Sequence, residues 1–573
     1  MVVASRPGLD LTLGQQCAEG ELLTGSQMVW EALLREGVDV VFGYPGGQVI
    51  PLYHALPDYP LHHVLVRHEQ AAAHAADGYA RATGKVGVCV ATSGPGATNL
   101  ITGIATAYLD SSPIVAITGQ VPTNLLGRNA FQEVDTCSIS KAITKANFLV
   151  TEAAAVGPTL HEAFRLAASG RPGPVLVDIP RDVQVAQDRL SPLATPEPQP
   201  EANVDADPRL VRQVAALIRG AQRPLILAGH GVELSGASAE LRRLAEATGI
   251  PVISTMMGLG SFPGSHPLYF GMVGMHGRAY ANLALADCDL LLVLGSRLGD
   301  RTTSKTAAFA SRATVVHVDV DPAEIGKNVA ADVSFVGDVR VFLEALLREG
   351  VKRDGSEWLA QLSRRRAETP AREWGGNGHV SPQRAIRQLQ QETKGEAVIV
   401  TDVGQHQLWA AQHYVYDRPR SFLSSGGLGT MGFGLPAALG AKMGRPEADV
   451  WLVSGDGGLQ MTVQELATVV QEGVDLKMAL FNNGYLGMVR QWQELFYSRR
   501  YSSTTITGPD FLKVADAYDV PARRVEQDED VAEALRWARA VDGPALVEFI
   551  IEPEENVYPM VAPGGALTEI IDA

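Results

Sequence analysis

The chain has 573 residues, 46% of them apolar, which is enough for several domains with cores of their own. Its 48 Lys and Arg residues against 64 Asp and Glu residues give a formal net charge of −16, which disfavours nucleic acid and anionic membranes as partners. The four cysteines show no CxxC spacing, so we expect neither a disulfide framework nor a zinc site. No apolar run reaches about 18 residues and no secretory signal is evident, so we expect a cytoplasmic protein.

Residues 1–21 are expected to form an N-terminal tail, and residues 22–190 a first domain. Short apolar runs alternate there with helical stretches, which predicts a parallel sheet covered by helices. The predicted strands are residues 40–42, 64–66, 86–91, 114–118 and 175–179. The proline-rich stretch 191–208 is predicted to be a linker.

A second unit of the same kind is predicted over residues 209–348. Its strands are expected at residues 225–228, 252–253, 290–294 and 315–320. Residues 349–380 lose the strand pattern and are interpreted as a second linker with room for one helix. The arginines at 364–366 would then form a solvated helix face.

The third unit covers residues 381–553 and precedes a C-terminal tail at 554–573. Its strands are expected at residues 398–401, 450–453, 478–481 and 545–551. The predicted fold class is therefore α/β, with three doubly wound parallel-sheet domains. A weak echo links the first and third units, because residues 88–96 resemble residues 450–457 in shape.

The end of one strand in the third unit has the features of a site for a metal-bound diphosphate. The strand runs into Gly455-Asp456-Gly457, where glycines let backbone N–H groups approach phosphate oxygens. Asp456 and Asn483 offer hard oxygen ligands suited to Mg²⁺ that shares its shell with a diphosphate. A helix at 462–471 and a strand at 477–481 would bring both ligands to neighbouring strand ends. The cofactor indicated is thiamine diphosphate, and the alternative is an ordinary turn followed by an unrelated Asn pair.

Glu69 stands at a strand-to-helix junction before an alanine-rich helix. Thiamine diphosphate reacts once its C2 loses a proton, which its own aminopyrimidine can remove when a carboxylic group engages the opposite ring nitrogen. Burial beside an apolar helix would keep the Glu69 carboxyl protonatable. The alternative is that Glu69 only interacts favourably with the helix dipole.

Residues 67–81 resemble the activating-glutamate segment of thiamine-diphosphate enzymes, and the rest of the chain is similar to the catalytic subunit of acetohydroxyacid synthases (acetolactate synthases). The resemblance covers nearly everything from residue 22 to residue 571. It implies a pyrimidine-binding, a central FAD-binding and a diphosphate-binding domain. The further matching motifs are residues 42–47, 92–99, 118–123, 130–133, 402–407, 426–434 and 487–493.

The resemblance implies roles for residues around thiamine diphosphate and Mg²⁺. Glu69 would engage the pyrimidine, and the backbone carbonyl of Tyr485 would complete the metal shell of Asp456 and Asn483. Met431 would hold the cofactor bent, although it could also be core filler. The other implied cofactor contacts are Gly404, Gln405, His406, Gly429, Gly455, Gly457, Gly458 and Met488.

The resemblance also implies substrate contacts. Gln132 and Gly47 would lie near the reacting carbons, as catalytic residues together with Glu69. Trp492 would be the wall that favours 2-oxobutyrate as acceptor, although packing alone explains many tryptophans. The other implied substrate contacts are Phe131, Met275 and Arg301.

The central domain resembles the family's FAD-binding domain, in which arginine can pair with phosphate and a carboxylate can accept ribose hydroxyls. Without the family, Gly229-x-Gly231 after a strand is only a weak nucleotide signal. The chain has Leu298-Gly299-Asp300-Arg301-Thr302 where family members often show Phe-Asp-Asp-Arg-Val, which affects the expected wall of the FAD site and substrate channel. The implied FAD contacts are Arg171, His276, Gly277, Gly295, Ser296, Arg297, Asp300, Asp319 and Asp338.

The implied activity is that of an acetolactate synthase, a transferase (carboligase). It decarboxylates pyruvate and joins the remaining two-carbon unit to pyruvate or 2-oxobutyrate, giving 2-acetolactate or 2-aceto-2-hydroxybutyrate in the first common step of branched-chain amino acid biosynthesis. The alternatives are a glyoxylate carboligase, which Glu69 disfavours, a pyruvate oxidase, which Trp492 disfavours, and a noncatalytic nucleotide-binding paralogue, which an intact Asp456 disfavours. The resemblance also implies a homodimer or tetramer with shared active sites, and a small regulatory subunit.

Overall fold

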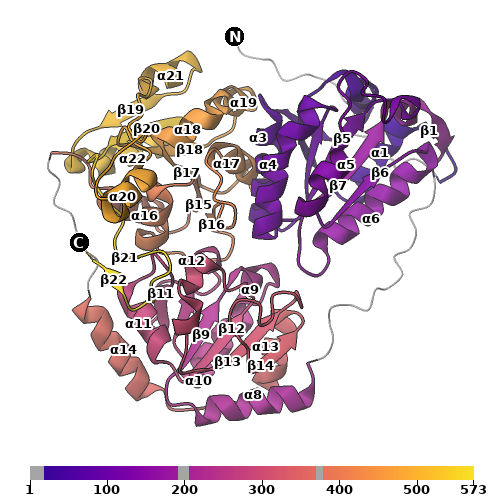
Figure 1. Cartoon of the computed structure of the whole chain (residues 1–573). Helices are drawn as coiled ribbons and strands as arrows, with labels where there is room; N and C mark the ends of the chain where they lie inside the picture. Colours follow the sequence, from indigo (N-terminus) through magenta and orange to yellow (C-terminus); the bar gives the residue numbers. More distant parts are fainter. Residues whose placement is uncertain (1–18, 191–205, 370–377, 573) are drawn as a thin grey trace. The chain divides into compact units, whose positions relative to one another are not determined.

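The computed structural model describes residues 19–190, 206–369 and 378–572 (Figure 1). Its internal contacts divide the chain into two units. Unit 1 comprises Met1–Arg81 with Lys85–Glu197, and unit 2 comprises Ala82–Gly84 with Pro198–Ala573. Unit 1 holds one six-stranded parallel sheet and unit 2 holds two, so the predicted α/β class with three parallel sheets is confirmed.

The sheet of unit 1 has the strand order β3-β2-β4-β5-β7-β6. Its inner strands β4, β5 and β7 are buried along their whole length, because helices cover both faces. The strands are β2 (Val40–Gly43), β3 (His62–Leu65), β4 (Gly87–Ala91), β5 (Ile114–Gln120), β6 (Ala146–Leu149) and β7 (Val175–Pro180), beside the antiparallel pair β1 (Leu22–Thr24) and β8 (Gln187–Arg189). The helices are α1 (Gly25–Arg35), α2 (Ile50–Ala55), α3 (Glu69–Thr83), α4 (Pro95–Asp110), α5 (Thr136–Ser140), α6 (Val156–Ala168) and α7 (Arg181–Val185).

The first sheet of unit 2 has the order β11-β10-β9-β12-β13-β14. Numbered along the chain this is 3-2-1-4-5-6, the order of dinucleotide-binding sheets, and it reverses between β9 and β12. The strands are β9 (Pro224–Ala228), β10 (Val252–Ser254), β11 (Tyr269–Met272), β12 (Leu290–Leu294), β13 (Thr314–Asp319) and β14 (Val333–Val336). The helices are α8 (Pro208–Gly220), α9 (His230–Leu234), α10 (Ser238–Thr248), α11 (Ala279–Asp287), α12 (Asp300–Thr303), α13 (Val339–Arg348) and α14 (Ser356–Glu368).

The second sheet of unit 2 has the order β16-β15-β17-β18-β20-β19. This repeats the serial order of the unit 1 sheet, in which the second strand lies beside the first and the sixth beside the fourth. The strands are β15 (Val398–Thr401), β16 (Phe422–Leu423), β17 (Val450–Gly455), β18 (Lys477–Asn482), β19 (Ala522–Val525) and β20 (Ala545–Ile550). The helices are α15 (Pro382–Thr393), α16 (Gln405–His413), α17 (Gly434–Gly444), α18 (Asp456–Thr462), α19 (Leu466–Gln471), α20 (Gly487–Phe496), α21 (Phe511–Ala517) and α22 (Val531–Ala540).

The echo between residues 88–96 and 450–457 has a structural basis, because β4 and β17 are both the third strand of their sheets. The predicted helix at 462–471 starts too late. The chain enters α18 at Asp456, directly after β17, and the helical path breaks at Thr462 before α19 begins. The two glycines at 457 and 458, which are poor helix formers, conceal this helix in the sequence.

Helix α14 lies in the stretch interpreted as a second linker, and it packs on the first sheet of unit 2. Trp358 and Leu362 are buried there, and Trp358 Nε1 donates to Pro224 O at 3.1 Å. The predicted solvated arginine face is only partly solvated, because Arg364 and Arg366 are exposed and Arg365 is half-buried. Arg365 pairs with Asp287 at 2.6 Å, and the Arg366 guanidinium lies 4.9 Å from the ring centroid of Phe270, because the helix runs alongside the sheet's covering elements.

The segment after residue 553 joins the two domains of unit 2. Val557 is buried in the core of the second sheet, whereas Val561 and Leu567 belong to a core cluster of the first. Strand β21 (Met560–Val561) pairs with β22 (Ile570–Ile571). The linker predicted at 191–208 and the tail at 1–21 fall mostly outside the described residues, and α8 begins at Pro208.

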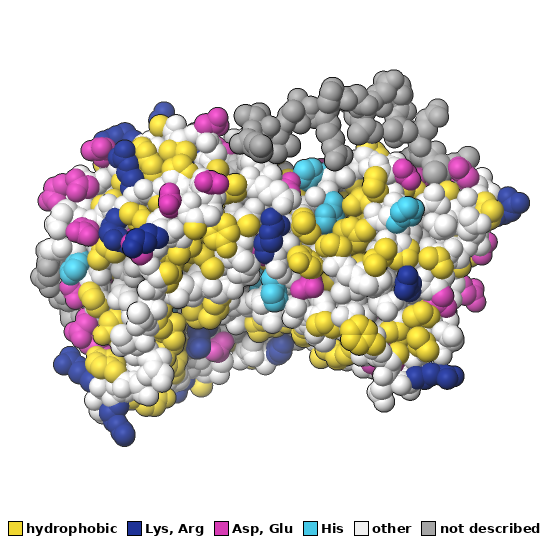
Figure 2. All heavy atoms as spheres, turned by 90° about the horizontal axis from the view of Figure 1, so that it is seen from above, with side chains coloured by type: hydrophobic (Ala, Val, Ile, Leu, Met, Phe, Trp, Pro, Cys, Tyr) yellow, Lys and Arg dark blue, Asp and Glu magenta, His cyan; other side chains and the backbone are white. Residues whose placement is uncertain are grey.

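Acidic and basic side chains are interspersed on the face drawn in Figure 2, with hydrophobic side chains between them. Within the described ranges, no helix is both long and apolar enough to span a bilayer.

Candidate cofactor and active site

A cavity lies at the carboxyl ends of β15 and β17, where the strand order of the second unit 2 sheet reverses. Open α/β sheets bind ligands at such a switch point. The structure therefore brings together most of the residues predicted to contact the diphosphate. The predicted residues that line the cavity are Gly404, Gln405, His406, Met431, Gly455, Asp456, Gly457, Gly458, Asn483, Tyr485 and Met488.

Asp456 and Asn483 are held by the turn between them. Asp456 Oδ2 accepts from the backbone N–H of Gly484 at 3.1 Å, and Asn483 Oδ1 accepts from that of Tyr485 at 3.1 Å. Asn483 Nδ2 donates to Gln405 Oε1 at 3.2 Å, so the Asn483 amide is oriented with its nitrogen toward Gln405 and its oxygen away from it. Burial raises the pKa of Asp456 to about 6, a cost that a bound cation would offset.

Three glycines leave room that a side chain would fill. A Cβ on Gly404 (φ +155°) or on Gly455 would lie 2.8 Å from the His406 ring, and one on Gly458 would lie 2.3 Å from Asp402 Oδ1. His406 is buried, its Nε2 has no partner in the structure, and burial lowers its pKa to about 3. A neutral imidazole with one unpaired nitrogen, beside bare backbone, fits a phosphate oxygen as its missing partner.

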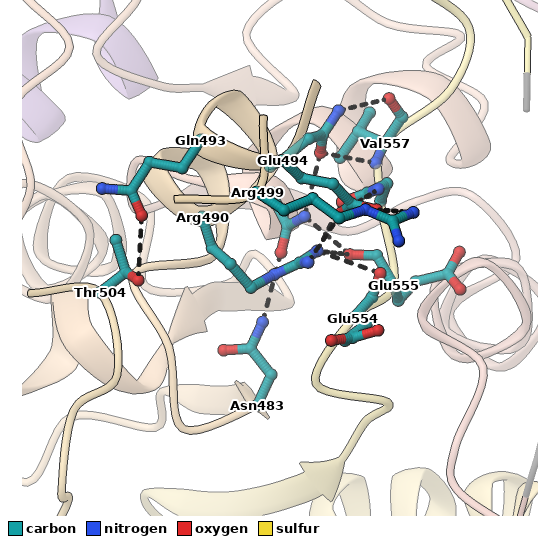
Figure 3. Close-up of polar contacts among 12 residues, drawn as sticks. Asn483, Arg490, Gln493, Glu494, Arg499, Thr504, Glu554, Glu555 and Val557 are labelled. Atoms are coloured by element: carbon teal, nitrogen blue, oxygen red, sulfur yellow. Dashed lines mark hydrogen bonds and ion pairs between the residues drawn. The ribbon is translucent and has the colours of Figure 1, made fainter. Parts of the chain in front are cut away.

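A polar network ties this cavity to the segment after residue 553 (Figure 3). Gln405 Nε2 donates to Gln491 Oε1 at 3.0 Å and to Glu555 O at 2.8 Å. Gln491 in turn exchanges two hydrogen bonds with the backbone of Val557, at 2.8 and 3.0 Å. Arg490, 1% exposed, pairs with Glu494 at 2.9 Å and donates to Glu554 O at 3.0 Å. Helix α20 is thereby fixed against both the cavity and the end of the chain.

The structure also brings together three of the predicted substrate residues. The Arg301 guanidinium lies 5.7 Å from the ring centroid of Trp492, within range of a cation–π interaction. Met275 N donates to Arg301 O at 2.9 Å. Trp492 and Met488 also line an open groove along α20. Residues from both domains of unit 2 thus meet beside the Asp456 cavity.

Unit 1 carries a second cluster at the ends of its strands. Glu69 begins α3, and its Oε2 accepts from Asn99 Nδ2 at 2.9 Å. Gly96 packs closely beside it, since a Cβ there would lie 3.3 Å from Glu69 Oε1 and 2.8 Å from Thr92 Cγ2. Gly94 (φ +59°) lets the backbone of Gln132 approach, since a Cβ there would lie 2.8 Å from Gln132 O. Glu69 and Gln132 therefore flank the same glycine turn after β4.

Gly47 and Phe131 belong to this cluster as well. The residue after Gly47, Gln48, donates its N–H to Thr92 Oγ1 at 3.1 Å, which holds Gly47 beside the end of β4. Phe131 is 86% exposed, so it contributes an apolar surface without a partner in unit 1. Four of the predicted residues of unit 1, namely Gly47, Glu69, Phe131 and Gln132, thus lie near the turn after β4.

Most of the predicted FAD residues lie at or after the carboxyl ends of β11, β12 and β13 in the first sheet of unit 2. Gly231 N donates to Gly295 O at 2.9 Å, and these two glycines pack backbone to backbone. His276 is buried with its Nδ1 unpaired, and its pKa is lowered to about 4, chiefly by burial. Leu298, in the segment that departs from the family pattern, is buried with φ +51°, an uncommon conformation for a branched residue. The strand order of this sheet is that of dinucleotide-binding sheets, and His276 Nδ1 is left without a hydrogen-bond partner in the structure.

The remaining predicted FAD residues are less directly placed. Asp338 caps α13, accepting from Arg340 N at 2.7 Å, and Asp319 accepts from Asp321 N at 3.0 Å at the end of β13. Arg171 lies in unit 1 and donates to Ser111 Oγ at 2.8 Å. Gly277, Ser296 and Arg297 lie on the turns after β11 and β12, and Asp300 begins α12. Gly429 lies after β16 outside the Asp456 cavity's lining.

Two polar residues near these sites, Asn99 and Asp402, have no role in the sequence analysis. Asn99 holds Glu69, and it stands in a recognised motif without an assigned role. Asp402 is buried at the end of β15 and accepts from the backbone of Gly432 and Gly434. The signal that could have found Asp402 is a carboxylate directly after the strand predicted at 398–401.

The chain was compared with known proteins. Three thiamine pyrophosphate enzyme models match it: the N-terminal TPP-binding domain over residues 23–139, the central domain over 211–346, and the C-terminal TPP-binding domain over 402–549. Acetolactate synthase of Mycobacterium bovis is 50% identical, covering 96% of this chain and 91% of the relative. The acetolactate synthase isozyme 2 large subunit of Escherichia coli K12 is 47% identical (96% and 100%), and a probable acetolactate synthase large subunit of Methanocaldococcus jannaschii 46% (96% and 95%).

Three parallel-sheet domains with a glycine-lined diphosphate cavity define the class of thiamine-diphosphate-dependent enzymes. Within that class, the chain belongs to the acetolactate synthase family.

Proposed function

We propose that this chain is the catalytic subunit of an acetolactate synthase. It would decarboxylate pyruvate and join the two-carbon unit to a second pyruvate or to 2-oxobutyrate. The observation that carries this proposal is the pairing of the glycine-lined Asp456–Asn483 cavity with an adjoining wall built from Trp492 and Arg301. The near full-length similarity to acetolactate synthases supports it.

In this proposal Asp456, Asn483 and the Tyr485 carbonyl hold Mg²⁺, and the diphosphate lies on the backbone of Gly404, Gly455 and neighbouring residues. One carboxylate and one amide suit Mg²⁺, which usually keeps other oxygen ligands such as phosphate and water. His406 would supply a hydrogen bond through its unpaired Nε2. Bound thiamine diphosphate would supply a carbon that accepts the electrons of decarboxylation.

Glu69 would hold a proton at the pyrimidine nitrogen. Asn99 donates to one oxygen of its carboxyl, which leaves the other oxygen, beside Gly96, to face the ring. The glycine at 96 keeps that approach open. Gln132 and Gly47 would orient the substrate near the same edge, and Met431, in the wall of the cavity, would support the bent cofactor.

Trp492 would set the choice of acceptor. Arg301 above its ring supplies a positive charge suited to the carboxylate of a 2-oxoacid, while the indole and Met275 offer an apolar wall for an alkyl group. FAD would lie on the first sheet of unit 2, near His276 and Gly295, with no net redox role in the main reaction. The substrates pyruvate and 2-oxobutyrate would be the physiological partners.

A homodimer or tetramer with active sites shared between chains, and a small regulatory subunit, complete the proposal. Support for a separate regulatory chain comes from relatives that are named as large subunits. Mixing inactive Glu69→Gln and Asp456→Asn chains tests the sharing, because only a site built from two chains regains activity. The readout is acetolactate formed per minute, against each variant alone.

The proposed activity is tested by incubating the purified chain with pyruvate and measuring products with thiamine diphosphate, Mg²⁺ and FAD each added or omitted. Acetolactate that requires thiamine diphosphate and Mg²⁺ is expected. Acetyl phosphate or hydrogen peroxide in its place would indicate a pyruvate oxidase. Absence of turnover with bound cofactors would indicate a noncatalytic paralogue.

A further inference from the structure

The ends of β5 and β7 in unit 1 carry a buried carboxylate–amide pair that the proposed chemistry does not use. Asp178 is 1% exposed and Gln120 is 2% exposed. Gln120 Nε2 donates to Asp178 Oδ2 at 2.9 Å, and Thr118 Oγ1 lies 2.7 Å from Asp178 Oδ1. Within the described ranges, no cation pairs with the Asp178 carboxyl.

Gln120 joins this pair to the loop that follows β5. Its Nε2 also donates to the carbonyl oxygen of Val134 at 2.7 Å, and its Oε1 accepts from the N–H of Val121 at 2.8 Å. Val121 and Val134 are the two ends of the loop, here called the 121–134 loop. Because one amide contacts both ends, a reversed amide would lose all of these hydrogen bonds.

The 121–134 loop carries Gln132 in a conformation that needs support. Gln132 has φ +60° and Asn129 φ +54°, both in the left-handed region. The Glu133 carboxylate accepts from the N–H of Ala130 at 2.8 Å and from that of Gly127, which organises the tip of the loop. Backbone strain of this kind persists only where the surroundings enforce it. The tip is therefore held by Glu133 and the base by Gln120.

The same device recurs in unit 2, at the same place in a sheet of the same strand order. Thr118 pairs with Asp178 across β5 and β7, and Leu480 pairs with Glu548 across β18 and β20. The amide lies two residues further along in each case. Asn482 Nδ2 donates to Glu548 Oε1 at 2.7 Å, and Asn482 directly precedes Asn483. In both sheets, an amide–carboxylate pair on the fourth and sixth strands fixes the segment that carries a site residue.

We propose that Gln120 and Asp178 are positioning residues that hold the 121–134 loop so that Gln132 faces the reacting carbons. The proposal rests on the carboligase function proposed above. Neither residue contacts Glu69 or Asn99 in the structure, so cofactor activation does not depend on them. The recurrence on two sheets argues for positioning of a functional segment, beyond local packing.

The groups that face Asp178 are Asp135 and Cys137. Burial, together with the charge of Asp135, raises the pKa of Asp178 to about 7. Burial, with the charges of Asp178 and Asp135, raises the pKa of Cys137 to about 12, so the thiol stays neutral. The Asp178 carboxylate forms above neutral pH, where it accepts the Gln120 N–H as a charge-assisted hydrogen bond.

The test compares the full chain, loaded with thiamine diphosphate, Mg²⁺ and FAD, with Gln120→Met and Asp178→Asn. For Gln120→Met we expect kcat for acetolactate to fall about tenfold to a hundredfold, because the loop base is released. The Kd of thiamine diphosphate should stay within about twofold, and hydrogen exchange of the amides at 121–134 should become faster. Asn147→Leu is the matched control, since it removes an amide that contacts Cys137 O, beyond the loop.

Asp178→Asn keeps an oxygen that accepts from Gln120, so we expect kcat within about threefold of wild type at pH 6. We expect the wild-type kcat profile to show an inflection near pH 7, where Asp178 ionises, and we expect the Asp178→Asn profile to lack it. Unchanged kcat and exchange in Gln120→Met would overturn the proposal, and so would a wild-type pH profile in Asp178→Asn. Wild-type chain that formed no acetolactate would instead overturn the proposed function, while the exchange measurement would still test the loop contact by itself.

Discussion

The unit 1 sheet and the second sheet of unit 2 have the same serial strand order, but different functional residues follow their strands. After the second and third strands, unit 1 presents Glu69 beside the bare backbone of Gly94 and Gly96. After the first and third strands, unit 2 presents His406 and Asp456 around a cavity. In the proposed function, one scaffold would therefore serve a proton-holding carboxyl, and a second scaffold of the same strand order would serve a metal and a diphosphate.

The comparison of the two sheets indicates that the strand order determines where a site lies and that the short turns after the strands determine what the site binds. Both sheets reverse strand order between their first and third strands, which is where open α/β sheets bind ligands. The turn after β4 offers Gly94 and Gly96 with no carboxylate, whereas the turn after β17 offers Asp456 at the start of a helix. Function follows from a few residues at equivalent points.

The largest expected effect comes from a substitution in the proposed site residues of unit 1 alone. Glu69→Gln should lower kcat for acetolactate by about a hundredfold or more, because only the proton-holding carboxyl is lost. FAD absorbance and thiamine diphosphate binding should persist. The assay is acetolactate formation, with Glu152→Gln on the surface of unit 1 as control. Wild-type turnover in Glu69→Gln would remove Glu69 from this role.

A substitution in the proposed metal-binding residues of unit 2 alone should weaken the binding of thiamine diphosphate. Asp456→Asn should weaken Mg²⁺-dependent binding of thiamine diphosphate by about a hundredfold, because the only carboxylate of the proposed metal shell is lost. Isothermal titration with and without Mg²⁺ measures this. Asp516→Asn, an exposed aspartate of α21, is the control. Equal affinity in Asp456→Asn and wild type would show that the metal lies elsewhere.

The segments that follow the fourth strand also differ between the two sheets. In unit 1 this segment is the loop that carries Gln132, and in unit 2 it includes α20 with Trp492. Trp492→Leu should lower the preference for 2-oxobutyrate over pyruvate as acceptor about tenfold, since the two differ by one methylene and one methylene is worth about 1–3 kcal/mol in a fitted pocket. Product ratios from mixed substrates measure it. Trp537→Leu is the matched control, because the Arg523 guanidinium lies 4.5 Å from the centroid of the Trp537 ring. This variant should leave the product ratio unchanged.

The last prediction concerns stability instead of turnover, and it compares the two carboxylates on the sixth strands. Glu548 pairs with Arg524 at 2.7 Å, whereas Asp178 is raised to a pKa of about 7 by burial without a cation. Its unfolded pKa is about 4, so the unfolded chain releases this proton first and stability falls as pH rises from about 4 to 7, by about 1.4 kcal/mol per pH unit. Asp178→Asn should lack this slope.

Thermal unfolding of wild type and Asp178→Asn at pH 5 and pH 8 measures the slope. The variant should gain several degrees in Tm over wild type between the two pH values. Glu548→Gln is the counterpart control, and it should destabilise at both pH values because it leaves Arg524 without its buried partner. Parallel Tm curves for wild type and Asp178→Asn would contradict a raised pKa at Asp178.

The sequence predicts the inner strands of all three sheets and misses most of the edges. Strands β15 and β12 match their predicted bounds, because fully buried strands are continuous apolar runs. The edge strand β19 reads Ala-Arg-Arg-Val and is half exposed, and β14 alternates buried and exposed residues. Edges face solvent on one side and carry a weaker apolar signal.

The residues of the candidate site divide in a similar way, into those that local sequence predicts and those that depend on which strands are neighbours. Glu69, Asp456 and Asn483 lie beside predicted strand ends within recognisable motifs, so their local sequence is informative. The contact of Gln120 with Asp178 spans 58 residues and depends on which strands are neighbours, which no local pattern contains. The earlier start of α18 was hidden because its first turn holds two glycines.

The most direct test of the central claim is a mixed-substrate assay in which ¹³C-labelled pyruvate and unlabelled 2-oxobutyrate are given to the chain with thiamine diphosphate, Mg²⁺ and FAD. Mass spectrometry should detect 2-aceto-2-hydroxybutyrate carrying the two-carbon label from pyruvate, together with fully labelled 2-acetolactate. Both products should vanish when Mg²⁺ is chelated. Consumption of pyruvate with neither product formed would contradict the account.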